Sequence, residues 1–483
     1  MAYNYKKLGF KAGLEIHQQI DSAKKLFSNA PNFLRNDKGD YTIKRKLHAV
    51  AGEEGEVDVA VKHEARLDKE FIYEAYKDTT SLVELDESPP ENLNEEALEI
   101  GLQIALLLNC EIYPVTQVMR KTVIDGSNTS GFQRTVLIGH SGFLETSFGK
   151  VEVDTVALEE DSARVIERGK ESVLYRLDRL GIPLIEIATS PSMKNPEQVK
   201  ECALKIGEIL RACKVKRGIG TIRQDVNVSI KGHDRVEIKG FQEPRMFVKT
   251  IDLEIERQLQ DIKKGKKSGE VRNAKEFGET EFLRPIPGKA RMYPETDLEL
   301  LRVDKKRIDL LKKNLPKLRS DIKEELKKKG LSDEMIKLVI NEDAADEFFA
   351  LIQVHDKDAN LIAKMIALWP REIATKENKP LEEVRHILDE RKLEEILELV
   401  DSGEINPRDV KEVMQKISSG VHFADAVKVE KASHDELEEE IRKIVKEKPG
   451  LRENAYMGIV MAKFKGKLDA KKAMEIIKRI VGE

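Results

Sequence analysis

The chain has 483 residues, of which 40% are hydrophobic and 36% are charged, a balance that supports folded domains and excludes a wholly disordered chain. Its 84 basic and 88 acidic residues give a net charge of −4, so any surface for nucleic acid has to be a local basic patch. Three scattered cysteines, no secretory leader and no apolar run near the ~20 residues of a membrane span predict a cytoplasmic protein without disulfides, structural zinc or membrane attachment.

Strand-like patterns dominate the chain up to about residue 299. Apolar residues alternate or run together in GFKAGLEIHQQI (9–20), EVDVAV (56–61), KVEVDTVAL (150–158), IPLIEIAT (182–189), DVNVSI (225–230) and RVEIKGF (235–241). Helical spacing occurs between them at residues 94–109 and 196–214, and the second of these helices begins at Pro196. The mixture predicts an α+β fold built on a mostly antiparallel sheet.

The pattern becomes helical after residue 299. Helical spacing continues from residue 303 to 420, and the end of the chain reads as a separate small helical segment. We therefore expect a sheet domain over residues 1–299, an all-α domain over 300–420 and a small helical tail domain over 421–483. Basic residues between positions 452 and 472 gather in the tail and suit contacts with phosphate groups, although lysine is frequent along the whole chain.

Carboxylates and one histidine occur on three of the expected strands. His17 shares a strand face with a glutamate two residues before it, Glu159 ends a strand, and Glu186 lies inside an apolar run, where a carboxylate needs a partner. Oxygen ligands with a single imidazole favour Mg²⁺ over zinc. In the alternative, Glu186 pairs with Arg179 or Lys239 and His17 faces solvent. Spacing alone favours that alternative, because a sequence does not show which strands adjoin.

The sharpest local pattern is TIRQDVNVSIKGHDRVEIKG, residues 221–240. Arg223, Asp225 and Asn227 fall on one face of a strand, and Lys239 continues that face after a turn. A half-buried sheet with such a polar face is able to hold a nucleotide. An ordinary solvated face is the commoner outcome, although an asparagine in the middle of a strand is unusual there. The sequence contains no P-loop, nucleophile elbow, H-E-x-x-H motif or dinucleotide fingerprint.

Six motifs in order, GLEIHQQ, ALEED, DRLGIPLIEIATSP, RQDVNVSI, EIKGFQ and RMYPETD, resemble those of the B/E subunit family of tRNA-dependent amidotransferases along nearly the whole chain. KTVIDGSNTSGFQRT and ARMYPETD look like the archaeal E subunits of that family. The resemblance implies a cradle domain, a helical domain and a tail domain. It also implies a Mg²⁺ site at His17, Glu159 and Glu186. Contacts to ATP or to the acyl acceptor are implied for Arg179, Arg223, Asp225, Asn227 and Lys239.

The reaction implied by the resemblance has three stages. ATP phosphorylates the side chain of glutamate mischarged on tRNA(Gln), an asparaginase-like D subunit releases ammonia from an amide donor, and ammonia displaces the phosphate to give Gln-tRNA(Gln). Such a protein is a ligase of the glutamine-hydrolysing glutaminyl-tRNA synthase type, works in a hetero-oligomer and uses Mg²⁺ to stabilise the transferring phosphoryl group. Two other functions stay open, a non-catalytic tRNA-binding subunit and an adenylate-forming ligase.

One part of the family pattern is missing from this chain. The E subunits usually carry an inserted domain similar to one in bacterial-type aspartyl-tRNA synthetases. Here GEVRNAKEF (269–277) is followed directly by GETEFLRPIPG (278–288), so the insert is absent. The B subunits of the family also lack it, and the resemblance therefore implies that catalysis does not depend on it.

Overall fold

The computed structural model forms two compact units, residues 1–318 and 319–483. It describes residues 3–48, 55, 57, 61–62, 65–66, 68–241, 244–286, 292–428, 434–464 and 470–482. For residues 434–437, 440, 461–464, 470–472 and 482 it describes the backbone alone. Each unit has a hydrophobic core of its own.

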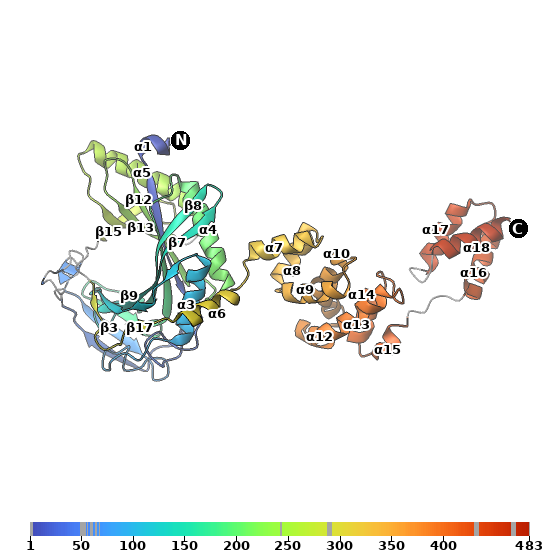
Figure 1. Ribbon diagram of the computed structural model, residues 1–483, viewed down its shortest axis with the longest axis horizontal. Coiled ribbons are helices and arrows are strands. Elements are labelled where there is room, and N and C mark those ends of the chain that lie inside the picture. Colours follow the sequence, from blue (N-terminus) through green and yellow to red (C-terminus); the bar gives the residue numbers. More distant parts are fainter. Residues whose placement is uncertain are drawn as a thin grey trace. The chain divides into compact units, whose positions relative to one another are not determined.

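The first unit is built on an eleven-stranded sheet (Figure 1). Ten strands follow the order β15-β14-β13-β12-β1-β11-β8-β7-β6-β16, and β4 pairs with β7. Neighbouring strands are antiparallel, except that β13 and β14 run parallel. The strands are β1 (Lys11–Gln19), β4 (Glu111–Ile112), β6 (Val118–Thr122), β7 (Phe132–Thr146), β8 (Gly149–Glu160), β11 (Pro183–Thr189), β12 (Ile222–Ser229), β13 (Val236–Phe241), β14 (Glu270–Ala274), β15 (Thr280–Pro285) and β16 (Met292–Pro294).

Two smaller sheets and five helices complete the described elements of this unit. The small sheets are β2-β3-β10-β9 and β17-β5. Their strands are β2 (Tyr41–Arg45), β3 (Glu70–Ala75), β5 (Val115–Thr116), β9 (Arg164–Arg168), β10 (Ser172–Arg176) and β17 (Leu301–Arg302). The helices are α1 (Tyr5–Leu8), α3 (Glu95–Leu107), α4 (Pro196–Ala212), α5 (Met246–Lys263) and α6 (Lys305–Lys313). Most of the strand expected at residues 56–61 lies outside the described residues, and residue 61 is helical.

The helices predicted at residues 94–109 and 196–214 are confirmed as α3 and α4. Both begin at an asparagine whose side chain accepts a hydrogen bond from a backbone N–H of the first turn, Asn94 from Ala97 and Asn195 from Gln198. Pro196 occupies the first turn of α4, where a backbone N–H has no partner within the helix, so the lack of an N–H in proline costs no hydrogen bond. Local sequence therefore sets where these two helices start.

The large sheet has an apolar face and a polar face. Ala12, Leu14 and Ile16 of β1 are buried in the main core together with residues of α3, α4 and α5. Figure 1 shows α4 and α5 along one side of the sheet. Because side chains alternate along a strand, Glu15 and His17 project from the opposite side, which we call the polar face.

The second unit is helical throughout its described residues. Its elements are α7 (Arg319–Lys328), α8 (Asp333–Asn341), α9 (Ala345–Val354), α10 (Ala359–Ala363), the π-helix η2 (Lys364–Leu368), α11 (Trp369–Glu377), α12 (Leu381–Ile387), α13 (Glu390–Asp401), α14 (Val410–Ser418), α15 (Phe423–Ala426), α16 (His434–Glu447), α17 (Glu453–Phe464) and α18 (Ala470–Gly482). One core spans α7 to α15, and a separate small core joins α16, α17 and α18. The lysine side chains at positions 463–472 lie outside the described residues, so their role as a phosphate-binding surface stays a prediction.

The α+β class is confirmed. The first unit extends to residue 318, because Leu311 of α6 is buried in the core of the large sheet rather than among the later helices. The division into domains over 1–299, 300–420 and 421–483 stays a prediction. Among the described helices, none combines the length and the apolar character needed to cross a membrane.

Candidate functional site

Strand order and register bring three residues that are far apart in the chain onto neighbouring strands. In the sheet, β1 lies between β11 and β12, and β8 follows β11. His17 of β1 lies directly opposite Glu186 of β11. Glu159 of β8 lies opposite Leu184, two residues before Glu186 on the same side of the strand. His17, Glu159 and Glu186 therefore share the polar face, where we call them the central cluster.

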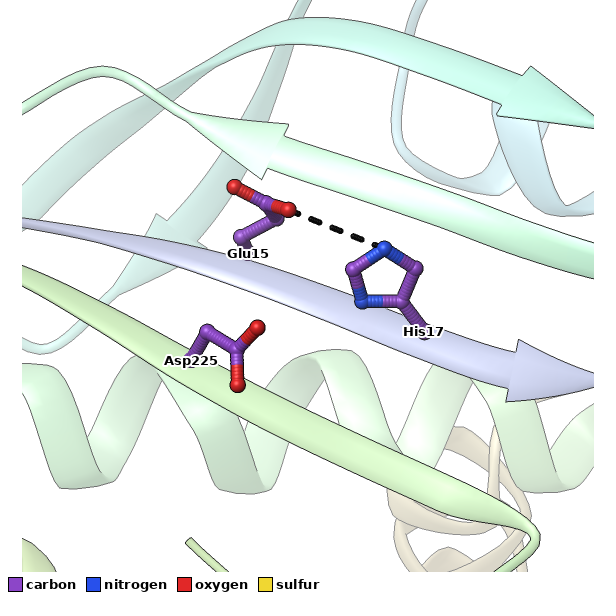
Figure 2. A group of neighbouring side chains, drawn as sticks. All are labelled: Glu15, His17 and Asp225. Carbon is purple, nitrogen blue, oxygen red and sulfur yellow. Dashed lines mark ion pairs between the residues drawn. The ribbon is translucent and has the colours of Figure 1, made fainter. Parts of the chain in front are cut away.

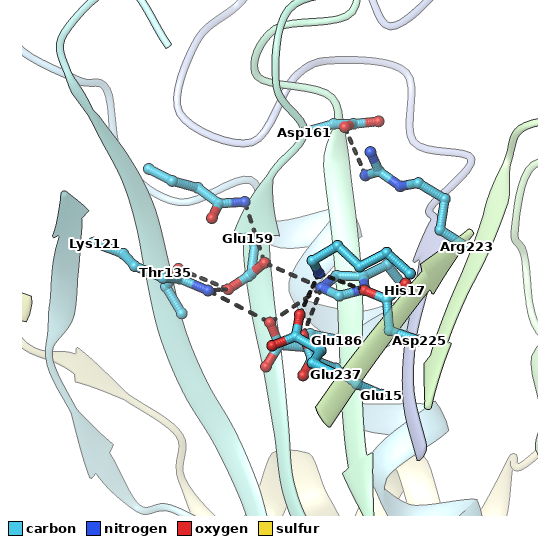
Figure 3. A network of polar contacts seen from close by, with 12 residues as sticks. Glu15, His17, Lys121, Thr135, Glu159, Asp161, Glu186, Arg223, Asp225 and Glu237 are labelled. Carbon is cyan, nitrogen blue, oxygen red and sulfur yellow. Dashed lines mark hydrogen bonds and ion pairs between the residues drawn. The ribbon is translucent and has the colours of Figure 1, made fainter. Parts of the chain in front are cut away.

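The side chains of the central cluster point toward one another (Figure 3). His17 Nε2 lies 3.2 Å from Glu186 Oε2 and 3.8 Å from Glu159 Oε2. If each of the three residues offers one ligand atom, these three atoms all lie within 4.8 Å of one another. The side chains are 13%, 1% and 17% exposed for His17, Glu159 and Glu186, so the cluster is nearly closed to water in this unit. The expectation that His17 faces solvent is wrong.

A lysine to which the motifs assign no role, the first residue of KTVIDGSNTSGFQRT, lies against both carboxylates. Lys121 of β6 forms an ion pair with Glu159 Oε1, and its Nζ lies 3.5 Å from Glu186 Oε2. Thr135 donates a 2.9 Å hydrogen bond to Glu159 Oε1, and Gln133 donates one of 3.1 Å to Oε2. Glu159 is thereby fixed in one orientation. The alternative in which Glu186 pairs with Arg179 or Lys239 is wrong, because Lys121 and His17 take that place.

Burial and the neighbouring charges shift the pKa values of the carboxylates in different directions. Burial and the charge of Glu186 raise the pKa of Glu159, and the same two causes raise the pKa of Glu15 to about 7. Burial opposes ionisation of Glu186 too, but Lys121 and His17 outweigh it and hold the pKa of Glu186 well below its usual value. Burial disfavours the imidazolium of His17, yet its hydrogen bond with Glu186 and the surrounding carboxylates raise the pKa of His17. Glu186 is thus the group that stays ionised.

A second acidic group adjoins the central cluster through His17 (Figure 2). Glu15 Oε1 lies 3.6 Å from His17 Nε2, and Glu15 lies directly opposite Asp225 on the neighbouring strand β12. Lys239 of β13 donates to Asp225 at 2.6 Å and pairs with Glu237 at the same distance. The polar face therefore continues unbroken from β6 across to β13. Sequence reasoning placed Asp225 and Lys239 on one face, and the structure confirms that placement.

Arg223 and Asn227 lie on the same face as Asp225. Arg223 pairs at 2.8 Å with Asp161, a buried carboxylate at the end of β8 that also accepts a 2.7 Å hydrogen bond from Gln19. Burial acts against ionisation of Asp161, but Arg223 and the nearby arginines prevail and lower its pKa. Asn227 Oδ1 is buried and has no hydrogen-bond partner among the described residues. A buried carbonyl oxygen in that state is a place where a bound ligand or ion is expected.

Arg179 is held by two backbone carbonyls and also lies 3.8 Å from Asp161, the carboxylate that pairs with Arg223. The Nε of Arg179 donates to the carbonyl of Ser162 at 2.7 Å and its guanidinium donates to that of Ala163 at 2.9 Å. These bonds tie the loop before β11 to the turn after β8. The expected role of Arg179 in binding ATP stays a prediction, and its visible role is to shape this corner of the sheet.

We expect the Arg179→Lys variant to lower the free energy of unfolding by about 1–3 kcal/mol, because an ammonium lacks the planar fork that reaches both carbonyls. Denaturant unfolding of the full chain measures the change. Arg168→Lys, at the exposed end of β9, is the matched control and is expected to change the free energy by less than about 0.5 kcal/mol. Equal stability of Arg179→Lys and the control would contradict this role.

The residues of the central cluster fit a hard divalent cation. Two carboxylates and one imidazole converge, and a third carboxylate, Glu15, adjoins them. Oxygen-rich sites suit Mg²⁺ or Mn²⁺, which keep water molecules in their remaining positions. The three acidic groups outnumber the one ammonium of Lys121, so a divalent cation would balance the charge that the protein leaves uncompensated.

Sequence reasoning missed the partners that orient the cluster. Lys121, Gln133 and Thr135 lie at the two ends of the motif KTVIDGSNTSGFQRT, residues 121–135, whose likeness to the E subunits implies no role for them. Alternation does not mark them either, because Arg134 between Gln133 and Thr135 is polar too. The motif does not reveal that β7 lies beside β8.

Comparison with known proteins gives consistent matches. The family model of the GatB/GatE catalytic domain matches residues 10–309. The E subunit of the glutamyl-tRNA(Gln) amidotransferase of Methanocaldococcus jannaschii is 34% identical over 639 residues, which cover 100% of both chains. The E subunit of the Thermococcus gammatolerans enzyme is 32% identical over 630 residues, covering 100% of this chain and 99% of the relative. That of Methanococcus vannielii is 50% identical over 260 residues, which are 54% of this chain and 41% of the relative.

The two full-length matches are longer than this chain. They extend over 639 and 630 residues, against 483 residues here, so both relatives carry residues without a counterpart in this chain. This agrees with the expectation that an inserted domain is missing.

Proposed function

The chain belongs to the GatB/GatE catalytic-domain family, and from this membership we propose that it is the glutamyl-tRNA(Gln) amidotransferase subunit that phosphorylates glutamate on tRNA(Gln) and then transfers ammonia to it. The observation that carries the proposal is the central cluster of His17, Glu159 and Glu186, buried on the polar face of the matched domain. The three residues lie on different strands, and the register that brings them together also buries them.

His17, Glu159 and Glu186 would hold Mg²⁺. When bound, this ion would supply positive charge that offsets the charge of the transferring phosphoryl group. Thr135, Gln133 and Lys121 hold Glu159 in place, so little reorganisation is needed when the ion enters. The near absence of exposed surface at the cluster limits attack by water on the activated glutamate.

The rest of the polar face supplies candidate contacts for the substrates. The side chain of Arg223 is 41% exposed and that of Lys239 is 28% exposed, so both have room for a phosphate or carboxylate oxygen. The buried oxygen of Asn227 lacks a partner among the described residues and accepts a hydrogen bond from a hydroxyl or amino group if one is brought there. Asp225 holds Lys239 and is a positioning residue in this proposal.

The direct test uses the purified chain with Glu-tRNA(Gln), ATP, Mg²⁺ and ammonium chloride. We expect Gln-tRNA(Gln) to form, with ADP and phosphate released in equal amounts. Release of AMP instead would show an adenylate-forming ligase. Binding of tRNA without any turnover of ATP would show a non-catalytic subunit.

The source of ammonia is proposed to be a partner, an asparaginase-like D subunit in a hetero-oligomer. The three thiols of the chain, all within the described residues, are buried, and burial raises the pKa of Cys110, Cys202 and Cys213 to about 12. Thiols in that state do not act as nucleophiles at neutral pH. The chain therefore offers no cysteine for amide hydrolysis.

We expect no measurable hydrolysis of glutamine or asparagine by the isolated chain. The reason is that the sequence carries no nucleophile motif and that the three cysteines, all among the described residues, are buried. Released ammonia is measured with a coupled dehydrogenase assay, and a triple Cys→Ser variant serves as the control for contaminating activity. Hydrolysis that copurifies with the chain through several columns and disappears in the variant would contradict this expectation.

A further inference from the structure

A cavity lies beside helix α5, at the one parallel pair of strands in the large sheet as the structure describes it. Strand β13, helix α5 and strand β14 form a β-α-β unit. The cavity, of about 740 Å³, lies where these strands end and the helix begins, and its lining includes Gly240, Arg245, Lys249, Thr250, Lys275 and Phe277. Ligands of parallel sheets bind at this end of the strands. We call it the β13–α5–β14 pocket.

The charge at this pocket suits an anion. Its lining has three cationic side chains, Arg245, Lys249 and Lys275, against one carboxylate, Glu276. Lys275 also pairs with Glu281 at 3.0 Å, and its side chain is 53% exposed. No described side chain caps the start of α5, and its first turn carries no acidic residue. The backbone N–H groups of that turn therefore add positive potential to the pocket.

A buried hydroxyl in the pocket wall is an independent sign of a ligand. Thr250 is 0% exposed, and its Oγ1 has no hydrogen-bond partner among the described residues. A helical threonine usually satisfies its hydroxyl on the carbonyl four residues before it, and Thr250 does not. An unpaired buried hydroxyl is unfavourable in the free protein. Because Thr250 has no exposed surface, a phosphate oxygen would accept a hydrogen bond from it once the pocket wall shifts on binding.

The pocket also offers an aromatic surface. Phe277, in the turn between β14 and β15, is 69% exposed. An exposed phenyl ring beside cationic side chains is the combination that binds unpaired nucleotides, with the base stacked and the phosphate neutralised.

The pocket lies at the end of β13, beside the polar face. Lys239 turns its side chain to Asp225 on the polar face, and the next residue, Gly240, donates its N–H to Asp225 at 3.3 Å and lines the pocket. We propose that the β13–α5–β14 pocket binds an unpaired nucleotide of the RNA substrate, its phosphate at Lys249, Lys275 and Thr250 and its base on Phe277. The identity of the RNA rests on the proposed function.

The first test measures the affinity of the full chain for an uncharged tRNA(Gln) transcript across a salt series. In the Lys249→Ala/Lys275→Ala variant we expect a roughly tenfold or greater loss of affinity near 0.1 M salt, and a log–log salt slope smaller by about 1 to 2, because fewer counterions are released. Lys263→Ala, in the last turn of the same helix and outside the pocket lining, is the matched control and should match the unmodified chain.

The second test separates a binding role of Thr250 from a structural one. In the Thr250→Val variant we expect a higher melting temperature of the free protein, since an unpaired buried hydroxyl is removed, together with a roughly threefold or greater loss of affinity for the transcript. If the hydroxyl of Thr250 is structural, the Thr250→Val variant will instead have a lower melting temperature and unchanged affinity for the transcript. That result would overturn the assignment of Thr250 to the binding site.

Two results would overturn the RNA assignment. One is unchanged tRNA affinity and salt slope in the double variant. The other is weaker binding of free ATP in that variant with tRNA binding intact, which would assign the pocket to the free nucleotide. Because the transcript is uncharged and no turnover is measured, failure of the unmodified chain to phosphorylate Glu-tRNA would defeat the proposed function and leave this binding test intact.

Discussion

Replacing His17 with alanine, or Glu186 with glutamine, is expected to lower transfer of the γ-phosphate of ATP to Glu-tRNA(Gln) by about 100-fold or more. His17→Ala removes one of three ligand atoms that lie within 4.8 Å of one another, and Glu186→Gln replaces a charged carboxylate ligand with a neutral amide, which binds a divalent cation more weakly. Neither side chain belongs to a hydrophobic core, since both project from the polar face. The variants should therefore fold. Single-turnover assays with γ-labelled ATP measure phosphoryl transfer, and circular dichroism measures whether the variants fold.

A matched control is available on β8. Glu152 is an exposed carboxylate near the start of β8, the strand that carries Glu159. Glu152→Gln removes the same charge from the same sheet and is expected to keep phosphoryl transfer within about twofold of the unmodified chain, as for a surface substitution away from the site. Full phosphoryl transfer by both His17→Ala and Glu186→Gln would place the catalytic centre elsewhere.

The Lys121→Met variant is expected to lose about 3–5 kcal/mol of unfolding free energy when divalent cations are chelated. The side chain of Lys121 is only 13% exposed and lies against two carboxylates of the central cluster, Glu159 and Glu186. Removing it leaves buried negative charge without its ammonium. Because a cation that binds only the folded state stabilises it, we expect Mg²⁺ or Mn²⁺ to restore part of this loss.

Denaturant unfolding in EDTA and in millimolar Mn²⁺ measures this effect. The control is Lys150→Met, since the ion pair of Lys150 with Glu145 joins two side chains that are 59% and 66% exposed. An exposed pair of this kind contributes at most about 1 kcal/mol and gives no reason for a dependence on Mn²⁺. Equal losses in the two variants, or no recovery with Mn²⁺ in Lys121→Met, would contradict the picture of a cation site whose negative charge Lys121 partly offsets in the free protein.

The sequence predicts the polar face better than it predicts the site. Strict alternation places Arg223, Asp225 and Asn227 on one side of a strand, and the structure has them there. Successive side chains of a strand point to opposite faces, so burying the apolar residues on one face puts these three on the other. Asn94 and Asn195 similarly mark the starts of α3 and α4, because the capping bond is made within three residues.

Strand order lies beyond such local reasoning. β1 is held between β11 and β12, which are more than 150 residues later in the chain, and no local pattern encodes that pairing. Spacing alone therefore favoured solvent exposure for His17 and an arginine or lysine partner from another motif for Glu186. The observed partner, Lys121, comes from β6, which reaches the cluster across β7. Family resemblance, rather than spacing, pointed to His17, Glu159 and Glu186 together.

The most direct test of the account is to locate the cation. Crystals of the full chain grown with Mn²⁺ and a non-hydrolysable ATP analogue, and measured at the manganese absorption edge, show the ion by its anomalous scattering. We expect one strong peak enclosed by His17, Glu159 and Glu186, and no peak there in crystals of the Glu186→Gln variant. A strong peak elsewhere in the chain, or bound nucleotide with no ion at these three residues, would contradict the central claim.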